Sequence, residues 1–433
     1  MDIPSIPRPR RKLIRAPGGG ERFFTVFVLL LSTTAFTNLM GSEDSAPGTG
    51  ALAFIMQSLW SAIYLTAWVL MQRGCPKGFL GVVRRDKLLF LLVALTMVSV
   101  SWSDDPAFTF RRSVALMGTT LFGVYFARRY SLSDQLRLLS HVFLSAAILS
   151  PVFVAILPHY GLADPMFGYA WQGIYGHKNG LGAAMALGVV VFIFRAVSDR
   201  QKSLRWWGAV GLALFLLWMS HSSTGLVACA FTVSALIFSP ALRWTFRKAV
   251  LFFLGVGLLA TGVVLWAINH MAFVLSMVSR DSSFTGRTTV WLVSVAMIAR
   301  HPWIGYGYNE AWPSYGSDIV ARLTGLPGMS HAHNAVLNLW LDLGLMGVVV
   351  FILQYFKSLW RAVVVVRDTK TFEWLWPLVF LLFLAAYGLV ESVVLQRNGL
   401  SWILFTAVVV QVSSRACARP SAVTLSPRNR AAA

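Results

Sequence analysis

Residues 331–356 read HAHNAVLNLWLDLGLMGVVVFILQYF. The segment begins with polar side chains and continues as an apolar run of membrane length. Apolar runs of about 18 residues or more span a hydrocarbon core of ~30 Å when they are helical. The run follows a mostly polar connection that begins near Asn269, the longest between two apolar runs of this chain. We therefore expect a membrane helix that starts near residue 332 below a large loop.

The composition extends this conclusion to the whole chain. The 433 residues are 57% hydrophobic and 12% charged, whereas soluble domains carry about 25% charged residues. Lipid offers backbone groups no hydrogen-bonding partner, so spanning segments are helices. The sequence predicts an all-α, polytopic integral membrane protein with about 12 transmembrane helices, at 23–40, 51–71, 87–102, 113–127, 136–157, 179–195, 206–220, 223–239, 249–270, 332–356, 373–391 and 399–414.

Lysine and arginine are distributed unevenly between the two sides of these spans. The segments predicted to be inside hold 29 of the 37 basic residues, and those outside hold 8. Basic residues retain loops in the cytoplasm, which favours an even number of spans with both termini cytoplasmic. The same distribution explains the formal charge of +20, so we expect no nucleic-acid partner.

Five regions follow from the predicted spans. Residues 1–22 are a basic cytoplasmic tail, residues 23–270 hold the first nine transmembrane helices, and residues 271–331 form a large outer loop with short helices. Residues 332–414 hold helices 10–12, and residues 415–433 form a second cytoplasmic tail. Both tails have the composition of disordered segments.

Arg287 begins a predicted helix within the outer loop. A guanidinium there can bind a phosphate through two hydrogen bonds, although an arginine at the water interface also binds lipid headgroups or extends to water. Arg111 and Arg112 follow Asp104 and Asp105, so they form either a local ion pair or an anion site. The topology rule disfavours basic residues outside, so these positions require a reason.

Two further cations lie on the predicted outer side. Arg397 occupies the last outer turn, where the same alternatives apply. Lys178 opens the sixth span, and the free amide groups of a helix N-terminus favour anions. The sequence thus predicts several positive charges near one membrane surface.

A polar stripe enters the membrane from the outer side. His331, Asn334, Asn338 and Asp342 are spaced to share one face of a helix, and His333 lies at its mouth. Polar side chains on a spanning helix face the protein interior or a watery cavity. Either histidine can accept a proton from a sugar hydroxyl near neutral pH, whereas the simpler alternative is hydrogen bonding between helices.

Common cofactor motifs do not occur in the sequence. Zinc bound by His331 and His333 would need further ligands, and no HExxH pattern or cysteine pair supplies them. Walker A and Rossmann motifs are missing, so nucleotide-driven transport lacks support. We expect neither a metal nor another cofactor.

Five short motifs in this order resemble the O-antigen ligase/polymerase superfamily of bacterial envelope proteins, and most closely its rhizobial, succinoglycan-type exopolysaccharide polymerases. The motifs cover roughly residues 100–350 and are Trp102-Ser103-x-Asp105-Pro106 with Arg111-Arg112, Gly176-His177-Lys178-Asn179-Gly180, Ser283-x-x-Gly286-Arg287 with Trp291, His301-Pro302-x-x-Gly305-x-Gly307, and His331-Ala332-His333-Asn334 with Gly344-x-x-Gly347. The resemblance implies a GT-C-like glycosyltransferase of the bacterial inner membrane, with the large loop in the periplasm.

The resemblance also implies residue roles. A histidine or a carboxylate deprotonates the acceptor hydroxyl, and we assign this role first to His333 and then to His331. Arg287 holds the donor diphosphate, assisted by Arg111, Arg112, Arg397 and Lys178, and the supporting residues are Asn334, Asp342 and His301. The family often has glutamate where Asp342 stands, which puts the role of Asp342 in doubt. The assisting carboxylate stays open among Asp164, Asp281, Glu310, Asp318 and Glu391.

The function predicted on this basis is an exopolysaccharide polymerase that joins undecaprenyl-diphosphate-linked repeat units on the periplasmic face. Its partners would be the lipid-linked donor, the growing glycan acceptor and membrane lipid, with a flippase and a chain-length co-polymerase as candidate protein partners. One alternative is an O-antigen ligase that transfers finished glycan to lipid A core or protein. Alternatives of other classes are a lipid-linked sugar or polysaccharide transporter and a structural assembly partner.

Overall fold

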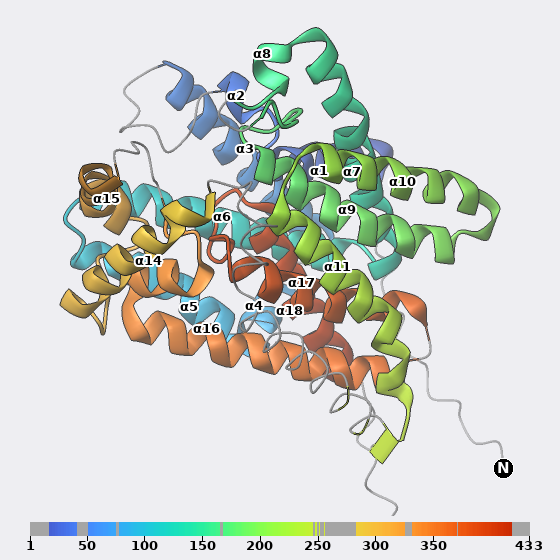
Figure 1. Ribbon diagram of the computed structural model, residues 1–433. Coiled ribbons are helices and arrows are strands. Elements are labelled where there is room, and N and C mark those ends of the chain that lie inside the picture. The colour runs from blue at the N-terminus through green and yellow to red at the C-terminus, as the bar shows by residue number, and fades with distance from the viewer. Residues whose placement is uncertain are drawn as a thin grey trace, which may run out of the picture.

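The computed structural model describes residues 17–40, 51–74, 78–164, 168–245, 283–324, 331–369 and 371–417, with isolated residues between 247 and 255. Figure 1 shows that helices dominate these regions, and the described residues contain no strand beyond two isolated bridges. The predicted all-α fold is confirmed. The principal helices are α1 (Gly19–Leu31), α2 (Thr37–Met40), α3 (Ala51–Gly74), α4 (Gly78–Arg85), α5 (Lys87–Val98), α6 (Pro106–Arg129), α7 (Leu132–Ile156), α8 (Pro158–Gly161), α9 (Lys178–Ser198), α10 (Ser203–Met219), α11 (Ser223–Phe238), α14 (Ser283–Arg300), α15 (Ser317–Thr324), α16 (Ala335–Asp368), α17 (Trp376–Gly388) and α18 (Leu400–Cys417).

Several helices are long and apolar enough to cross a membrane, as expected of a polytopic membrane protein. By length and composition the described residues supply five such segments and three shorter apolar ones. Each span predicted from the sequence overlaps a described helix, except 249–270, which lies almost wholly outside the described residues. The five long segments are Phe54–Gln72, Leu132–Ile156, Lys178–Ser198, Ser223–Arg243 and Ala335–Asp368.

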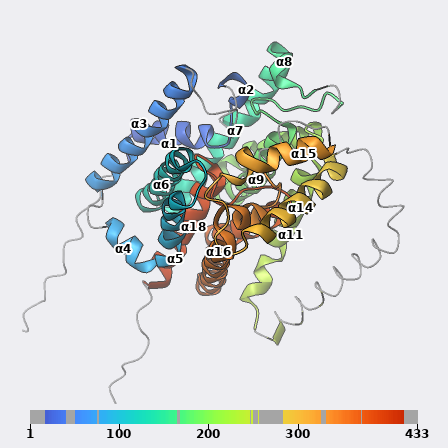
Figure 2. The same ribbon diagram turned by 90° about the vertical axis from the view of Figure 1, so that its left-hand side faces the viewer.

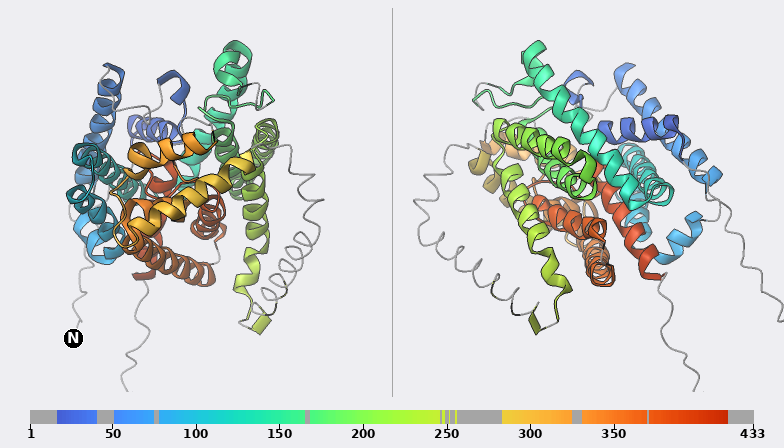
Figure 3. Two further views of the ribbon diagram at one scale, coloured as in Figure 1. Left: turned by 60° about the vertical axis from the view of Figure 1, so that its left-hand side comes forward. Right: turned by 90° about the vertical axis from the view of Figure 1, so that its right-hand side faces the viewer.

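Helix α9 forms the centre of the bundle. Its apolar window is 78% buried, against 44% or less for the other four long segments, and it packs against α7, α10 and α11. Figure 2 shows α3, α4 and α6 on one side of the molecule and α14 and α15 on the other. In Figure 3 the long helix α7 extends away from the bundle toward α8. The apolar interior is thus built around a helix whose first residue, Lys178, belongs to a predicted site.

Helix α16 runs along the bottom of the molecule in Figure 1 and contacts α5, α14, α17 and α18. It is broken at Gly344, whose φ of 65° and ψ of −169° are not helical. Only glycine adopts such a conformation without a steric cost. A Cβ atom added here would lie 2.2 Å from the carbonyl carbon of Trp303. The single span expected over 332–356 is therefore two helical segments, the second reaching Asp368.

The loop 301–307 fills the break in α16. Four backbone hydrogen bonds join them: from Tyr306 N to Leu341 O (2.8 Å), from Gly307 N to Asp342 O (3.1 Å), from Leu345 N to Pro302 O (2.8 Å) and from Met346 N to Trp303 O (3.3 Å). A break leaves helical amide and carbonyl groups unpaired, and groups unpaired within a membrane are costly. The loop supplies their partners and is held against α16 by its own backbone.

We expect Gly344→Ala to lower stability, because the new Cβ meets the Trp303 carbonyl and the backbone must keep a positive φ. The expected loss is about 2 kcal/mol or more. Thermal unfolding of the purified protein in detergent would measure it. Gly211→Ala in α10 is the control, since nothing lies within 4 Å of the added Cβ there. Equal melting temperatures for the two variants would contradict a required glycine at the break.

Candidate active site

Glu391 lies in the segment between α17 and α18 and is 9% exposed. Its Oε1 accepts hydrogen bonds from Arg287 Nη2 at 3.0 Å and from Asn179 Nδ2 at 3.2 Å. Its Oε2 lies 3.2 Å from His333 Nδ1 and 4.0 Å from His331 Nε2. We call these five residues the Glu391 cluster. The carboxylate joins residues that the sequence separates by as many as 212 positions.

The ends of α14 and α16 position three members of the cluster. Arg287 lies in the first turns of α14 and is 8% exposed. Trp291, one turn later, donates from Nε1 to the Ala332 carbonyl at 3.1 Å, which ties α14 to the two histidines that flank Ala332. The mouth of α16 is thereby fixed beside Arg287.

Asn334 completes this arrangement as the N-cap of α16. Its Oδ1 accepts from the backbone N–H groups of Val336 and Leu337, each at 3.0 Å. Its Nδ2 donates to the Leu389 carbonyl at 2.9 Å, which holds the segment of Glu391 against the same helix end. A side chain that satisfies free amide groups at a helix start stabilises the helix by about 1 kcal/mol. Asn334, predicted as a supporting residue, therefore connects α16 to the Glu391 segment.

The N-terminus of α9 contributes Asn179 to the cluster. His177 caps this helix, its Nδ1 accepting from the Asn179 backbone N–H at 3.2 Å. The Asn179 side chain donates to Glu391 and accepts from Ser222 Oγ at 3.1 Å. Ser222 in turn caps α11. The cluster is thus linked by hydrogen bonds to the starts of two further helices, and sequence reasoning assigned Asn179 and Ser222 no role.

The charges of the cluster favour an ionised Glu391. Burial raises the pKa of this carboxyl, but the hydrogen bond with His333, the charge of Arg287 and, when they are protonated, the charges of His333 and His331 outweigh burial and hold the pKa below its usual range. Burial also lowers the pKa of His177. The charges of Lys178 and Arg287 lower this pKa further, and the charge of Glu391 opposes them. Lys178, 4% exposed, therefore adds positive charge near this cluster.

The ionised carboxylate determines the tautomer of His333. A carboxylate can only accept hydrogen bonds, so the proton of the neutral ring lies on Nδ1. Nε2 then keeps its lone pair and can accept a proton. A carboxylate behind an imidazole holds the ring in orientation and stabilises the imidazolium formed on protonation. This geometry suits His333 to general-base chemistry.

His331 and His333 lie close together, with ring centroids 4.2 Å apart. With Glu391 they offer ligand atoms that lie within 4.8 Å of one another, a spacing at which a metal ion can be bound. Glu391 is thus the third possible metal ligand, which the sequence alone did not reveal. Arg287 already donates to Oε1 of the same carboxylate at 3.0 Å, and its fixed positive charge beside Glu391 disfavours a second cation there. We therefore interpret His333 as a general base and Glu391 as the carboxylate that orients it.

Other predicted residues form a second polar group around Tyr308. Asp342 is 3% exposed and accepts from the Asn309 backbone N–H at 3.0 Å and from Asn338 Nδ2 at 3.4 Å. Arg112 and Arg397 both act electrostatically on Tyr308, whose hydroxyl donates to the Leu395 carbonyl. Asn338 also accepts from the Ala332 backbone N–H at 3.2 Å. The predicted polar stripe of α16 therefore runs from the histidines to this second group.

The remaining predicted residues occupy peripheral positions. Arg111 is exposed on α6. Asp105 caps α6 through Phe108 N at 2.9 Å, and Asp104 accepts from the Tyr315 hydroxyl. His301 stacks on Tyr306 with 4.5 Å between ring centroids, within the loop that fills the α16 break.

The structure also distinguishes among the five candidate carboxylates. Glu391 contacts Arg287 and both histidines. Glu310 instead accepts from Ser314, and burial raises the pKa of its carboxyl. Asp281 lies outside the described residues. The sequence signal for Glu391 was only its place on the predicted outer side.

Comparisons with known proteins show which sequences this chain resembles. Residues 208–352 match the O-antigen ligase family. The chain is 25% identical over 345 residues to the exopolysaccharide production protein ExoQ of Rhizobium meliloti, covering 76% of this chain and 77% of that protein. It is 24% identical over 267 residues to a general O-oligosaccharyltransferase of Acinetobacter baylyi, covering 54% of this chain and 45% of that protein.

One name refers to the production of exopolysaccharide and the other to the transfer of oligosaccharide, so both names concern glycans. The matches confirm the resemblance predicted from the sequence: this chain is similar to O-antigen ligase/polymerase proteins, and its residues 208–352 match the O-antigen ligase family.

Proposed function

We propose that this protein is an exopolysaccharide polymerase, which joins undecaprenyl-diphosphate-linked oligosaccharide repeat units on the periplasmic face of the inner membrane. The observation that carries the proposal is the Glu391 cluster, in which one buried carboxylate holds an arginine and a histidine base side by side. The similarity to an exopolysaccharide production protein over 76% of the chain supports this product class. On the predicted topology, both termini are cytoplasmic and the cluster faces the periplasm.

The proposed reaction is the transfer of a sugar from a diphosphate to a hydroxyl. The acceptor hydroxyl oxygen attacks the anomeric carbon of the donor, and its proton passes to His333 Nε2. The bond between that carbon and the diphosphate oxygen breaks, and undecaprenyl diphosphate leaves with the electron pair. Glu391, hydrogen bonded to His333 Nδ1, stabilises the imidazolium. The products are a longer glycan and the lipid diphosphate.

Negative charge grows on the diphosphate as the bond breaks, so fixed donors there lower the barrier. Arg287 donates one N–H to Glu391 and has further N–H groups for phosphate oxygens. Lys178 and the N-terminus of α9 add positive charge beside it. In this proposal these protein groups take the role that a metal ion has in other phosphate chemistry, and no metal is required.

The deciding experiment is an assay with purified protein and undecaprenyl-diphosphate repeat units in EDTA and without ATP. Lipid-linked glycans longer than one repeat, separated on a gel, are the expected product. Transfer only after addition of lipid A core would instead make the protein a ligase, the alternative favoured by its similarity to an O-oligosaccharyltransferase. If the folded protein forms no glycosidic bond with either acceptor, the proposed enzyme activity is contradicted.

Variants of the two central residues should lose activity without losing the fold. We expect Arg287→Gln to lower kcat by roughly 100- to 1,000-fold, as loss of a donor to developing charge does. His333→Gln should lower kcat by about 100-fold or more, because the base is lost. The assay above measures both effects. Arg322→Gln and His159→Gln replace exposed residues of the same types and should keep wild-type rates.

Glu391 makes stability depend on pH in a predictable direction. Its folded-state pKa is held below the usual range, so its ionised form stabilises the protein at neutral pH, and this contribution is lost as pH falls through the folded pKa. Glu391→Gln should therefore melt below wild type at pH 7. The difference should shrink as the pH falls below the usual carboxyl pKa of about 4.3 toward the lower folded-state pKa, because the wild-type carboxyl then also becomes protonated. A constant difference over this range would argue against an ionised Glu391.

A further inference from the structure

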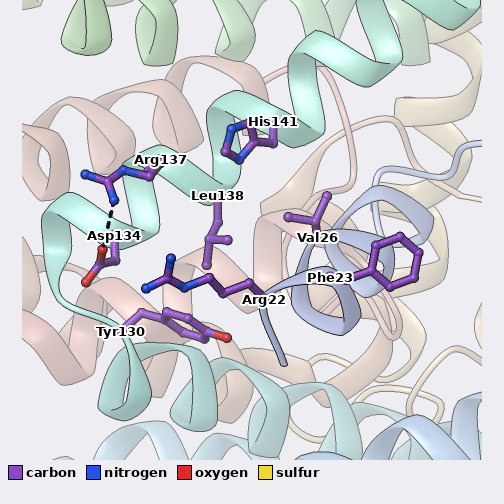
Figure 4. Close-up of a pocket in the computed structure, with 8 residues that line it drawn as sticks. All are labelled: Arg22, Phe23, Val26, Tyr130, Asp134, Arg137, Leu138 and His141. Atoms are coloured by element: carbon purple, nitrogen blue, oxygen red, sulfur yellow. Dashed lines mark ion pairs between the residues drawn. The ribbon is translucent and has the colours of Figure 1, made fainter. Parts of the chain in front are cut away.

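A cavity of about 270 Å³ lies between the start of α1 and the first turns of α7. Figure 4 shows that its two ends differ in character. Arg22 and Arg137 lie at the end that also holds Asp134, whereas Val26 and Phe23 lie at the other end. The cavity thus has one charged end and one apolar end, which matches an amphipathic ligand.

The charged end carries more positive charge than its single carboxylate neutralises. Arg137 Nη1 lies 3.9 Å from Asp134 Oδ1, and the two side chains are 49% and 39% exposed. An exposed pair at this distance contributes little. The other Asp134 oxygen accepts from Ser131 Oγ at 2.7 Å, within the cap of α7. Arg137 can therefore exchange this carboxylate for a stronger anion.

Arg22 adds a second guanidinium. It is exposed, and the neighbouring Glu21 carboxylate is paired with Arg129 at 2.6 Å. No carboxylate among the described residues pairs with Arg22. Two guanidinium groups from different helices therefore face one space, a geometry suited to a phosphate.

The apolar end continues onto the outside of α1. Phe23 is 74% exposed and Phe27, one turn later, is 42% exposed. The adjoining helix α7 is long and apolar enough to span a membrane. On the predicted topology, this end of α7 lies at the cytoplasmic surface, where basic pockets between helices bind anionic lipid headgroups.

We propose that this cavity binds an anionic phospholipid of the cytoplasmic leaflet. Its phosphate lies between Arg22 and Arg137, and its acyl chains follow Val26 and Phe23 toward the outside of α1. A free inorganic anion would use only the charged end, and a zwitterionic phospholipid carries its own cation beside the phosphate, which offsets the attraction of the two guanidinium groups. An anionic phospholipid matches both ends. The site is separate from the Glu391 cluster and from the proposed reaction.

Native mass spectrometry of the purified full-length protein in an uncharged detergent tests the proposal. The protein is titrated with phosphatidylglycerol or with phosphatidylcholine of the same acyl chains. Each guanidinium near a lipid surface contributes about fivefold in affinity, so Arg22→Gln with Arg137→Gln should weaken the tightest phosphatidylglycerol site roughly 25-fold. The matched control is Arg84→Gln with Arg205→Gln, two exposed arginines that do not line the cavity.

A second variant tests the apolar end without changing charge. Val26→Phe puts a larger side chain into the cavity and should also weaken phosphatidylglycerol binding. Melting temperatures measured in phosphatidylcholine verify that each variant is folded.

Three outcomes would overturn the proposal. Equal affinity for the two lipids would remove the role of the charge. Displacement of phosphatidylglycerol by millimolar inorganic phosphate would indicate a site for a free anion. An equal loss in the Arg84/Arg205 control would mean that the attraction comes from the whole basic surface. Selective loss in the Arg22/Arg137 variant, together with weaker binding by Val26→Phe, would establish the lipid site.

Discussion

A carboxylate removed from water must be compensated by charges and hydrogen-bond donors, and Glu391 receives both. Arg287 supplies the charge, while His333 and Asn179 supply further contacts. Loss of one partner of a buried pair leaves the other uncompensated, at a cost of about 3–5 kcal/mol. The starts of α9, α14 and α16 must therefore meet at one point for any of these groups to be satisfied. The position of the proposed catalytic groups follows from that requirement.

The same requirement explains how a mostly apolar bundle holds a polar site. The interior around α9 is filled by apolar side chains, and polar groups gather where helices begin. Free amide groups at these starts are satisfied by His177, Ser222 and Asn334, each of which also lies in or next to the cluster. Helix capping and site assembly thus use the same side chains.

Much of this architecture could be predicted from sequence. Hydropathy predicted the helices, because lipid permits few other structures. The spacing of Asn334, Asn338 and Asp342 predicted one polar face of a helix, and the structure joins these residues through hydrogen bonds in and around α16. Short-range patterns of this kind are set by helix geometry alone. The order of the motifs similarly predicted that Arg287 and His333 act in the same site.

Long-range pairing could not be predicted in the same way. Glu391 lies 104 positions from Arg287 and 58 from His333, so only the packing of helices distinguishes it from the other outer carboxylates. In the sequence, Asn179 is only one position of a motif, and its contact with Glu391 depends on the packing of the helices. The break at Gly344 also depends on tertiary structure, since a glycine within an apolar run does not reveal a positive φ.

The joint between loop 301–307 and α16 has an evolutionary consequence. Its hydrogen bonds use backbone amide and carbonyl groups, so they do not depend on the side chains of Trp303 and Ile304, whereas Gly305 leaves no room for a side chain against Leu341. Trp303 and Ile304 are 69% and 42% exposed, and their side chains are not what holds the loop in place. Exchanges at these two positions can alter the outer surface while the loop keeps its position. One helical scaffold can in this way diversify an exposed surface without any change in how its helices pack.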